Sequence, residues 1–169
     1  GHVTSSYDIS LMSRELLLKH PDITNYTTVY MDSLRDGKSQ LVNTNKLIRN
    51  YKGATGLKTG STSLALFNLS ASATRDDLSL IAVVMKAPTS ADRFADAKKL
   101  LDYGFKNYEF KQFGRSGDIV GNVSVEKGIE KNVNAILKDN CGVLLKKGTE
   151  NNIVQNVQLE PKLSAPILK

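Results

Sequence analysis

The first twenty residues carry the hydrophobic spacing of an amphipathic helix. Their apolar side chains recur at intervals of three and four residues, at Ile9, Met12, Leu16 and Leu17. Ser5-x-x-Asp8 in front of them is typical of a capping box, and His20-Pro21 is a stop signal. We therefore expect a helix whose apolar face packs on a core, with one more short turn between residues 21 and 26.

The next segment alternates as antiparallel strands do. Residues 27–31 and 39–42 predict a hairpin with its turn at Asp36-Gly37. Asn45 is placed to cap a short helix through Ile48 and Tyr51.

A second hairpin is predicted from residues 64–73 and 78–85, with its turn at 75–77. Ile81, Val83 and Val84 make its second strand almost continuously apolar, which indicates burial on both faces of a central sheet.

The longest predicted helix begins at a capping Ser90. Phe94, Ala97 and Leu101 form its inner stripe, and Gly104 is expected to end it in a left-handed conformation.

Beyond Tyr108 the helical patterns stop. Glycines separate short β-rich pieces, which are residues 119–125, 142–145 and 153–159. A small all-β module is therefore predicted from about residue 110 to the end.

Composition limits the classes of protein. The 169 residues suit one ordinary domain or two small ones, and 40% hydrophobic with 24% charged residues describes a soluble globular chain. The net charge of +6 is scattered, without a Lys/Arg-rich block or interleaved aromatic residues, so no nucleic-acid partner is expected. The longest apolar run, residues 78–85, is too short to span a membrane.

The residues that usually bind metals are sparse. Cys141 is the only cysteine, and its apolar neighbours at 143–145 predict a buried structural role. His2 and His20 lie too far apart, and lack partner cysteines, to indicate zinc. No metal and no cofactor is expected.

The most informative motif is Lys58-Thr59-Gly60, between a glycine-bearing loop and Ser61-Thr62. Strand alternation would place Lys58 and Gly60 on one face and Thr59 on the other. An ammonium, a hydroxyl and a residue without a side chain together suit a small anion, most simply a carboxylate.

The flanking segments strengthen this interpretation. They are residues 40–47, 71–76, 80–85 and 93–105. With the Lys-Thr-Gly triplet they closely resemble, in this order, the serine-type D-alanyl-D-alanine carboxypeptidases of peptidase family S11. These are the low-molecular-mass penicillin-binding proteins, which also carry Ser-x-x-Lys and Ser-x-Asn motifs. The likeness runs from about Thr4 to Tyr108, and a weaker one to the family's β-rich second domain follows.

The resemblance implies an α+β fold in two parts. Residues 1–109 would form the C-terminal part of the transpeptidase-like catalytic domain, an antiparallel sheet with helices. Residues 110–169 would form a small all-β domain, which we expect to be truncated.

The family's nucleophile motif is not found where its order requires it. The only Ser-x-x-Lys is Ser124-Val125-Glu126-Lys127, after the triplet, and Ser-x-Asn does not occur. We read the Ser124 motif as an exposed stretch of the β-domain. Thr55 also stands where the family usually has aspartate, and Leu66-Phe67 where Gly-Tyr is common. The chain alone is therefore expected to be inactive.

By resemblance, Lys58 and Thr59 would bind the terminal carboxylate of a stem peptide ending in D-Ala-D-Ala. Gly60 would keep the cleft open, and the backbone N–H of Ser61 would help form the oxyanion hole. The strand would pair with the substrate as far as Thr62. Asn45 either frames the cleft or only caps and turns.

The implied activity is removal of the terminal D-Ala from peptidoglycan stem peptides through a serine acyl-enzyme. The protein would be extracytoplasmic, at the cell wall or the outer face of the cytoplasmic membrane. Its partners would be the stem peptide, β-lactam antibiotics as inhibitors, and a missing N-terminal segment with the nucleophile. Membrane contact would need a C-terminal anchor that is absent here. Two alternatives remain: a catalytically inactive wall-binding or scaffolding module, and a β-lactamase-like hydrolase.

Overall fold

The computed structural model describes residues 3–149 and 153–166. The chain divides into two compact units, Gly1–Asn107 and Tyr108–Lys169, whereas the sequence placed the boundary after residue 109.

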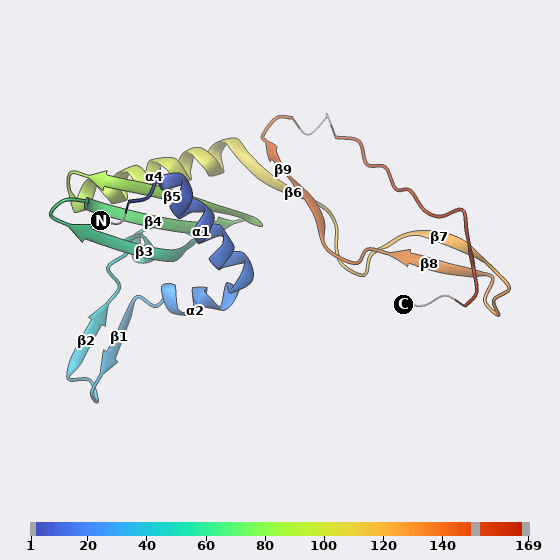
Figure 1. Cartoon of the computed structure of the whole chain (residues 1–169), viewed down its shortest axis with the longest axis horizontal. Helices are drawn as coiled ribbons and strands as arrows, with labels where there is room; N and C mark the ends of the chain where they lie inside the picture. Colours follow the sequence, from blue (N-terminus) through green and yellow to red (C-terminus); the bar gives the residue numbers. More distant parts are fainter. Residues whose placement is uncertain (1–2, 150–152, 167–169) are drawn as a thin grey trace. The chain divides into compact units, whose positions relative to one another are not determined.

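The first unit contains helices and antiparallel strands (Figure 1). Its elements are α1 (Ser6–Lys19), η1 (Pro21–Ile23), α2 (Thr24–Thr27), β1 (Met31–Leu34), β2 (Ser39–Val42), α3 (Leu47–Asn50), β3 (Ala54–Thr62), β4 (Leu66–Arg75), β5 (Leu78–Ala87) and α4 (Ser90–Asn107).

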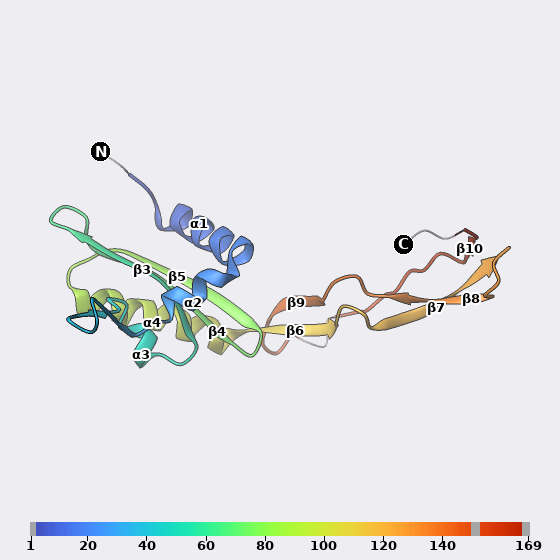
Figure 2. The same cartoon turned by 90° about the horizontal axis from the view of Figure 1, so that it is seen from below.

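The centre of this unit is an antiparallel sheet in the order β3-β4-β5. Helix α1 lies on one face and α4 on the other (Figure 2). The core is on the α4 side, where Leu69 and Ala71 of β4 meet Phe94, Ala97 and Leu101 of the helix. The contact on the α1 side includes a buried hydrogen bond between Ser13 Oγ and Ser70 Oγ, which lie 2.7 Å apart.

The ends of α1 follow the prediction. Ser5 accepts from the backbone N–H of Asp8, and the Asp8 carboxylate accepts from the N–H of Ser5, which completes the capping box. His20 caps the other end. The predicted inner face is only partly right, because Met12 and Leu16 are exposed.

The hairpin turn at Asp36-Gly37 is confirmed, with both residues at positive φ. Its first strand begins later than expected, at Met31. The reason is that residues 24–27 continue the preceding turn as α2, where Thr28 Oγ1 donates to the carbonyl of Thr24 (2.6 Å).

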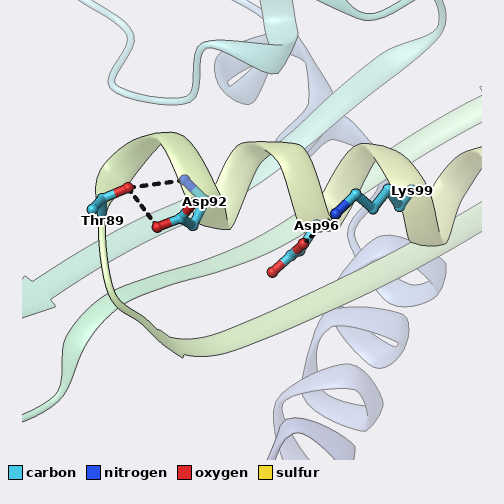
Figure 3. A network of polar contacts seen from close by, with 4 residues as sticks. All are labelled: Thr89, Asp92, Asp96 and Lys99. Carbon is cyan, nitrogen blue, oxygen red and sulfur yellow. Dashed lines mark hydrogen bonds and ion pairs between the residues drawn. The ribbon is translucent and has the colours of Figure 1, made fainter.

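Helix α4 differs from its prediction at both ends. Thr89, not Ser90, caps it: Thr89 Oγ1 accepts from the N–H of Asp92 and donates to its carboxylate (Figure 3). Asp96 and Lys99 form an ion pair one turn further on (Figure 3). Gly104 does not end the helix, which continues to Asn107. It packs closely against β5, because a Cβ there would lie 2.4 Å from Leu80 Cδ1 and the Leu80 side chain would have to shift.

A cluster at the end of the sheet distant from the Lys-Thr-Gly motif joins α3, β4 and α4. Tyr51 donates to the carboxylate of Asp102 (2.7 Å), while Arg75 stacks on the rings of Tyr51 and Phe105. Burial first, and then the hydrogen bond to Asp102, raise the pKa of Tyr51 to about 12.

This raised pKa predicts base sensitivity. Between pH 10 and about pH 12 the unfolded chain loses the Tyr51 proton and the folded chain keeps it, so stability falls as pH rises through that window and is fully present below it. The loss should be on the order of 2 kcal/mol. Unfolding free energies measured by denaturant at pH 9 to 12 should fall less steeply in Tyr51→Phe. Parallel curves for the two proteins would contradict the prediction.

The second unit is β-rich (Figure 1). Its strands are β6 (Tyr108–Gly114), β7 (Ile119–Glu126), β8 (Asn132–Ile136), β9 (Cys141–Lys146) and β10 (Lys162–Ser164). They form one sheet of β6 and β9 and another in the order β10-β7-β8, with β10 parallel to β7. Residues 153–159, predicted as a strand, form none.

Cys141 was expected to be buried, but it is exposed at the start of β9. It lines an apolar pocket of about 430 Å³ together with Phe113 and Leu137. The burial prediction was wrong because the apolar neighbours of Cys141 in sequence lie on β9, whose side chains are mostly exposed.

Helices with mainly antiparallel sheets confirm the α+β class. In the described part of the chain, none of the helices has both the length and the apolar character needed to cross a bilayer.

Candidate active site

Strand β3 carries the Lys-Thr-Gly motif along one edge of the sheet. Lys58 pairs with Ser70 of β4 and Gly60 with Asn68, so Lys58 and Gly60 lie on the face that α1 contacts. Thr59 pairs with Leu69 and lies on the α4 face. The predicted alternation is confirmed.

Lys58 borders an open pocket of about 300 Å³ between the start of α1 and the sheet. The remaining walls are Thr4, Ile9, Thr59, Gly60, Asn68–Ser70 and Val83–Met85. The side chain is exposed, and its Nζ donates to the carbonyl of Thr59 (2.6 Å). None of the described residues around the pocket is acidic, so an added carboxylate would be the natural counterion of this ammonium.

Thr59 is buried, and its hydroxyl lies 2.7 Å from that of Thr44. This pair fastens the segment after β2 to the motif strand. The sequence predicts that the Thr59 hydroxyl binds a substrate carboxylate. It would have to do so while keeping its hydrogen bond with the Thr44 hydroxyl.

Gly60 has room for a side chain within this chain. A Cβ built there meets no atom within 4 Å, and φ is not positive. Gly53, in contrast, has φ +80°, and a Cβ there would lie 2.3 Å from the carbonyl oxygen of Thr74. Gly53 is thus required by the fold. The missing side chain at Gly60, in contrast, leaves free space above an exposed part of strand β3.

The two glycines should respond differently to alanine. Gly60→Ala should leave the melting temperature nearly unchanged, because nothing clashes and alanine suits a strand no less than glycine. Gly53→Ala should cost on the order of 2 kcal/mol through backbone strain and overlap. Thermal unfolding of both variants tests this, and equal destabilisation would mean that Gly60 has a structural role of its own.

Ser61 and Thr62 are exposed at the end of the strand. Thr62 Oγ1 accepts from the N–H of Ala65 (2.9 Å), so this hydroxyl shapes the turn into β4. Among the described strands β3 lies at the edge of its sheet, so alternate backbone groups of its outer edge can pair with an extended peptide.

Asn45, predicted as a possible substrate contact, is 2% exposed. Its Nδ2 donates to the carbonyl of Gly56 (2.8 Å), and its Oδ1 accepts from the N–H of Leu47 (3.2 Å). The amide is therefore buried and already hydrogen-bonded to the backbone on both sides. Asn45 is not among the residues that line the pocket beside Lys58, and its amide links the first residue of α3 to β3, so a contact with substrate stays a prediction.

Thr55, the departure from the family's usual aspartate, forms a bulge between Ala54 and Gly56. Its hydroxyl lies 2.8 Å from Ser72 Oγ, and its carbonyl accepts from Thr27 Oγ1. A small hydroxyl side chain therefore fits a local network of hydroxyl groups.

Leu66, the second departure, has φ +52°, the left-handed region that favours glycine. Asn68 fastens this turn, because its Nδ2 donates to the carbonyls of Ala65 and Leu66, and its Oδ1 accepts from the N–H of Lys86.

No role was predicted for Arg93 from the sequence, and the structure places its side chain against the motif. Its Nη1 lies 3.3 Å from the carbonyls of both Gly60 and Asn68, and its Nη2 donates to Ser90 Oγ (3.1 Å). The side chain is 7% exposed, and burial lowers the pKa of its guanidinium. Among the described residues it forms no ion pair, and its Nε has no hydrogen-bond partner. The signals available in the sequence were its position on an otherwise amphipathic helix and its place at the start of the segment 93–105, which resembles the family.

Ser124, of the second Ser-x-x-Lys match, lies in β7 of the second unit. Its hydroxyl donates to the carbonyl of Pro161 (3.2 Å), and Lys127 follows the strand at φ +59°. These contacts agree with an ordinary strand residue.

The fold and the edge-strand motif define a class, the penicillin-binding proteins. Penicillin-binding protein 5 from Haemophilus influenzae superposes with a TM-score of 0.72 at 28% identity, covering 98% of this chain and 48% of that one. Penicillin-binding protein D2 from Listeria monocytogenes in its cefotaxime-bound form superposes with a TM-score of 0.53 at 34% identity, covering 56% of this chain and 38% of that one.

Within this class, the chain belongs to the D-alanyl-D-alanine carboxypeptidase family, whose model matches residues 1–89. A second model, for the C-terminal domain of penicillin-binding protein 5, matches residues 108–169. The D-alanyl-D-alanine carboxypeptidase DacF of Bacillus subtilis is 39% identical over 173 residues, which cover 100% of this chain and 44% of that protein. The chain thus spans less than half the length of this relative, in its C-terminal part.

Proposed function

We propose that this chain is the substrate-binding part of a D-alanyl-D-alanine carboxypeptidase that removes the terminal D-Ala from peptidoglycan stem peptides. The observation that carries the proposal is the Lys-Thr-Gly motif on an open edge strand, with an exposed ammonium and free space above Gly60. The family match over residues 1–89 supports it, because this range includes the whole motif strand.

Each group in the strand has a proposed role. The Lys58 ammonium binds the terminal carboxylate, with Thr59 as a second contact, and the strand through Thr62 pairs with the peptide. The N–H of Ser61 is one donor of the oxyanion hole, which stabilises the negative charge of the tetrahedral intermediate. Arg93 holds the carbonyl of Gly60, just before that N–H, and so positions it.

The acylating serine and the lysine that activates it belong, in this proposal, to a segment outside the chain. Their absence before Lys58 motivates this assignment. The same site would accept β-lactams as inhibitors, because they acylate the same serine. The protein would act outside the cytoplasm as a secreted or membrane-attached serine hydrolase, where trimming of stem peptides contributes to cell shape.

The test compares this chain with a joined protein, in which it is fused to the part of Bacillus subtilis DacF that precedes the matched region. Both are incubated with a fluorescent penicillin and run on a denaturing gel. The joined protein should be labelled and the chain alone should not. Label on Ser124 in the chain alone would overturn the assignment, and an unlabelled but folded joined protein would favour an inactive wall-binding module.

A further inference from the structure

The hydroxyl of Thr59 belongs to a pair. Among the described residues, its one side-chain hydrogen bond joins it to the hydroxyl of Thr44, 2.7 Å away. The two residues differ in exposure, because Thr59 is 8% exposed, whereas Thr44 lies exposed in the bend between β2 and α3. The proposed second contact of the substrate carboxylate is therefore itself held by a residue that has no role in the reaction so far.

The bend that carries Thr44 is fixed on both sides. Before it, Asn43 Nδ2 donates to the carbonyls of Thr27 (3.0 Å) and Val29 (2.9 Å). The other end of the same amide, Asn43 Oδ1, accepts from the N–H of Asn45 (2.9 Å). After the bend, Asn45 Nδ2 donates to a carbonyl of β3 (2.8 Å). Thr44 thus lies between two anchored residues, which hold its hydroxyl in place against Thr59 before any ligand binds.

The direction of this hydrogen bond decides what Thr59 can do. A hydroxyl has one proton to donate, and a carboxylate only accepts. If Thr59 donated to Thr44, its proton would not be available to a substrate carboxylate. If Thr44 donates to Thr59, the Thr59 proton is free for the ligand, and the two successive hydrogen bonds polarise each other. A carboxylate bound to Thr59 therefore requires that Thr44 be the donor of the pair.

The place of β3 at the edge of the described sheet makes this arrangement accessible. Lys58 and Thr59 both line the groove of about 300 Å³, although their side chains belong to opposite faces of the strand. A carboxylate at the edge can therefore meet the ammonium from one face and the hydroxyl from the other. The ammonium supplies the charge, and the hydroxyl pair supplies a hydrogen bond of fixed direction.

We propose that Thr44 is a positioning residue of this site, which donates to the Thr59 hydroxyl and so directs the Thr59 proton toward the terminal carboxylate of the substrate. The inference rests on the proposed function, in which Thr59 is a contact of that carboxylate. Thr44 acts through Thr59, and its contribution depends on the presence of a carboxylate, because a ligand without one leaves the direction of the hydroxyl pair without consequence.

The test measures acylation of the joined protein by two thioesters of the same N-acyl-D-alanine. The leaving group of one is thioglycolate, which carries a carboxylate, and that of the other is ethanethiol, which has a methyl group in its place. Thr44→Val removes the hydroxyl and keeps the shape, so it should slow the reaction of the thioglycolate ester roughly three- to tenfold and leave that of the ethanethiol ester nearly unchanged. Thr44→Ser keeps the hydroxyl and should restore most of the rate.

Thr74→Val is the matched control. Thr74 is an exposed threonine of β4 whose hydroxyl lies 2.8 Å from that of Ser79, so the substitution breaks a hydroxyl pair of the same kind at the other end of the sheet. It should be neutral with both thioesters. If Thr44→Val slows both thioesters equally, Thr44 only supports the fold and the inference is wrong, and an unchanged rate with both overturns it as well.

A binding measurement separates this inference from the proposed function. If the joined protein reacts with neither thioester, the proposed function fails, and N-acetyl-D-Ala-D-Ala is titrated into the chain itself and followed by NMR. Thr44→Val should then weaken the affinity for this peptide roughly three- to tenfold, and Thr74→Val should leave it unchanged. Equal affinities of the two variants would overturn the role given to Thr44.

Discussion

Lys58→Ala should lower the acylation rate of the joined protein by roughly a hundredfold or more. The exposed ammonium of Lys58 has no acidic neighbour among the described residues of its pocket, so a substrate carboxylate would be its counterion. Losing such a charge-assisted contact costs on the order of 2–4 kcal/mol of transition-state stabilisation. Lys58→Arg should restore only part, because a planar guanidinium projects differently from a compact ammonium.

The decisive comparison uses a peptide substrate whose last carboxylate is amidated. The wild-type joined protein should lose most of its activity on this substrate, whereas Lys58→Ala should be nearly indifferent to the amide. If amidation harms both proteins equally, another residue recognises the carboxylate and the role given to Lys58 is wrong.

Arg93→Met should also lower acylation, by roughly ten- to a hundredfold, for a different reason. The guanidinium donates to the carbonyls of Gly60 and Asn68 in two part-buried hydrogen bonds, and an acceptor that loses its donor costs at most about 1–3 kcal/mol. Stability should change less than activity, because the substitution also removes a buried charge that forms no ion pair with the described residues.

The amidated substrate distinguishes this positioning role from charge recognition. Arg93→Met should slow the reaction of carboxylate and amide substrates by the same factor, because it moves the strand and not the counterion. A lower rate seen only with the carboxylate substrate would mean that Arg93 binds the carboxylate directly. Arg93→Lys should recover little, since one ammonium cannot reproduce the fork that reaches Gly60, Asn68 and Ser90.

The features that were predicted correctly are local ones, which depend on residues close together in the chain. The capping box at Ser5 and Asp8 and the turn at Asp36-Gly37 are decided within a few residues, and both are confirmed. The alternation of Lys58 and Thr59 follows from strand geometry alone and is also confirmed.

What the sequence missed depends on residues far apart in the chain. In the sequence, Arg93 looks like a solvent-exposed residue of a helix. Its role becomes visible only in the structure, where it contacts Gly60, 33 residues earlier in the chain. Gly104 is typical of a helix end in the sequence, but in the structure it lies inside α4 and packs closely against Leu80 of β5. The hydrogen bond from the Asn45 amide to the carbonyl of Gly56, 11 residues later, could not be predicted from the neighbours of Asn45 in the sequence.

The unequal protection of β3 has a consequence for self-association. Its first half is held by the side chains of Thr27 and Asn45, which donate to the carbonyls of Thr55 and Gly56. Its last three residues, 60–62, are all exposed. An open edge strand can recruit the edge of another molecule, and shielding it is a common protection against aggregation. The few residues left open are those proposed to pair with a peptide, so a bound stem peptide or β-lactam should slow aggregation of the joined protein in concentrated solution.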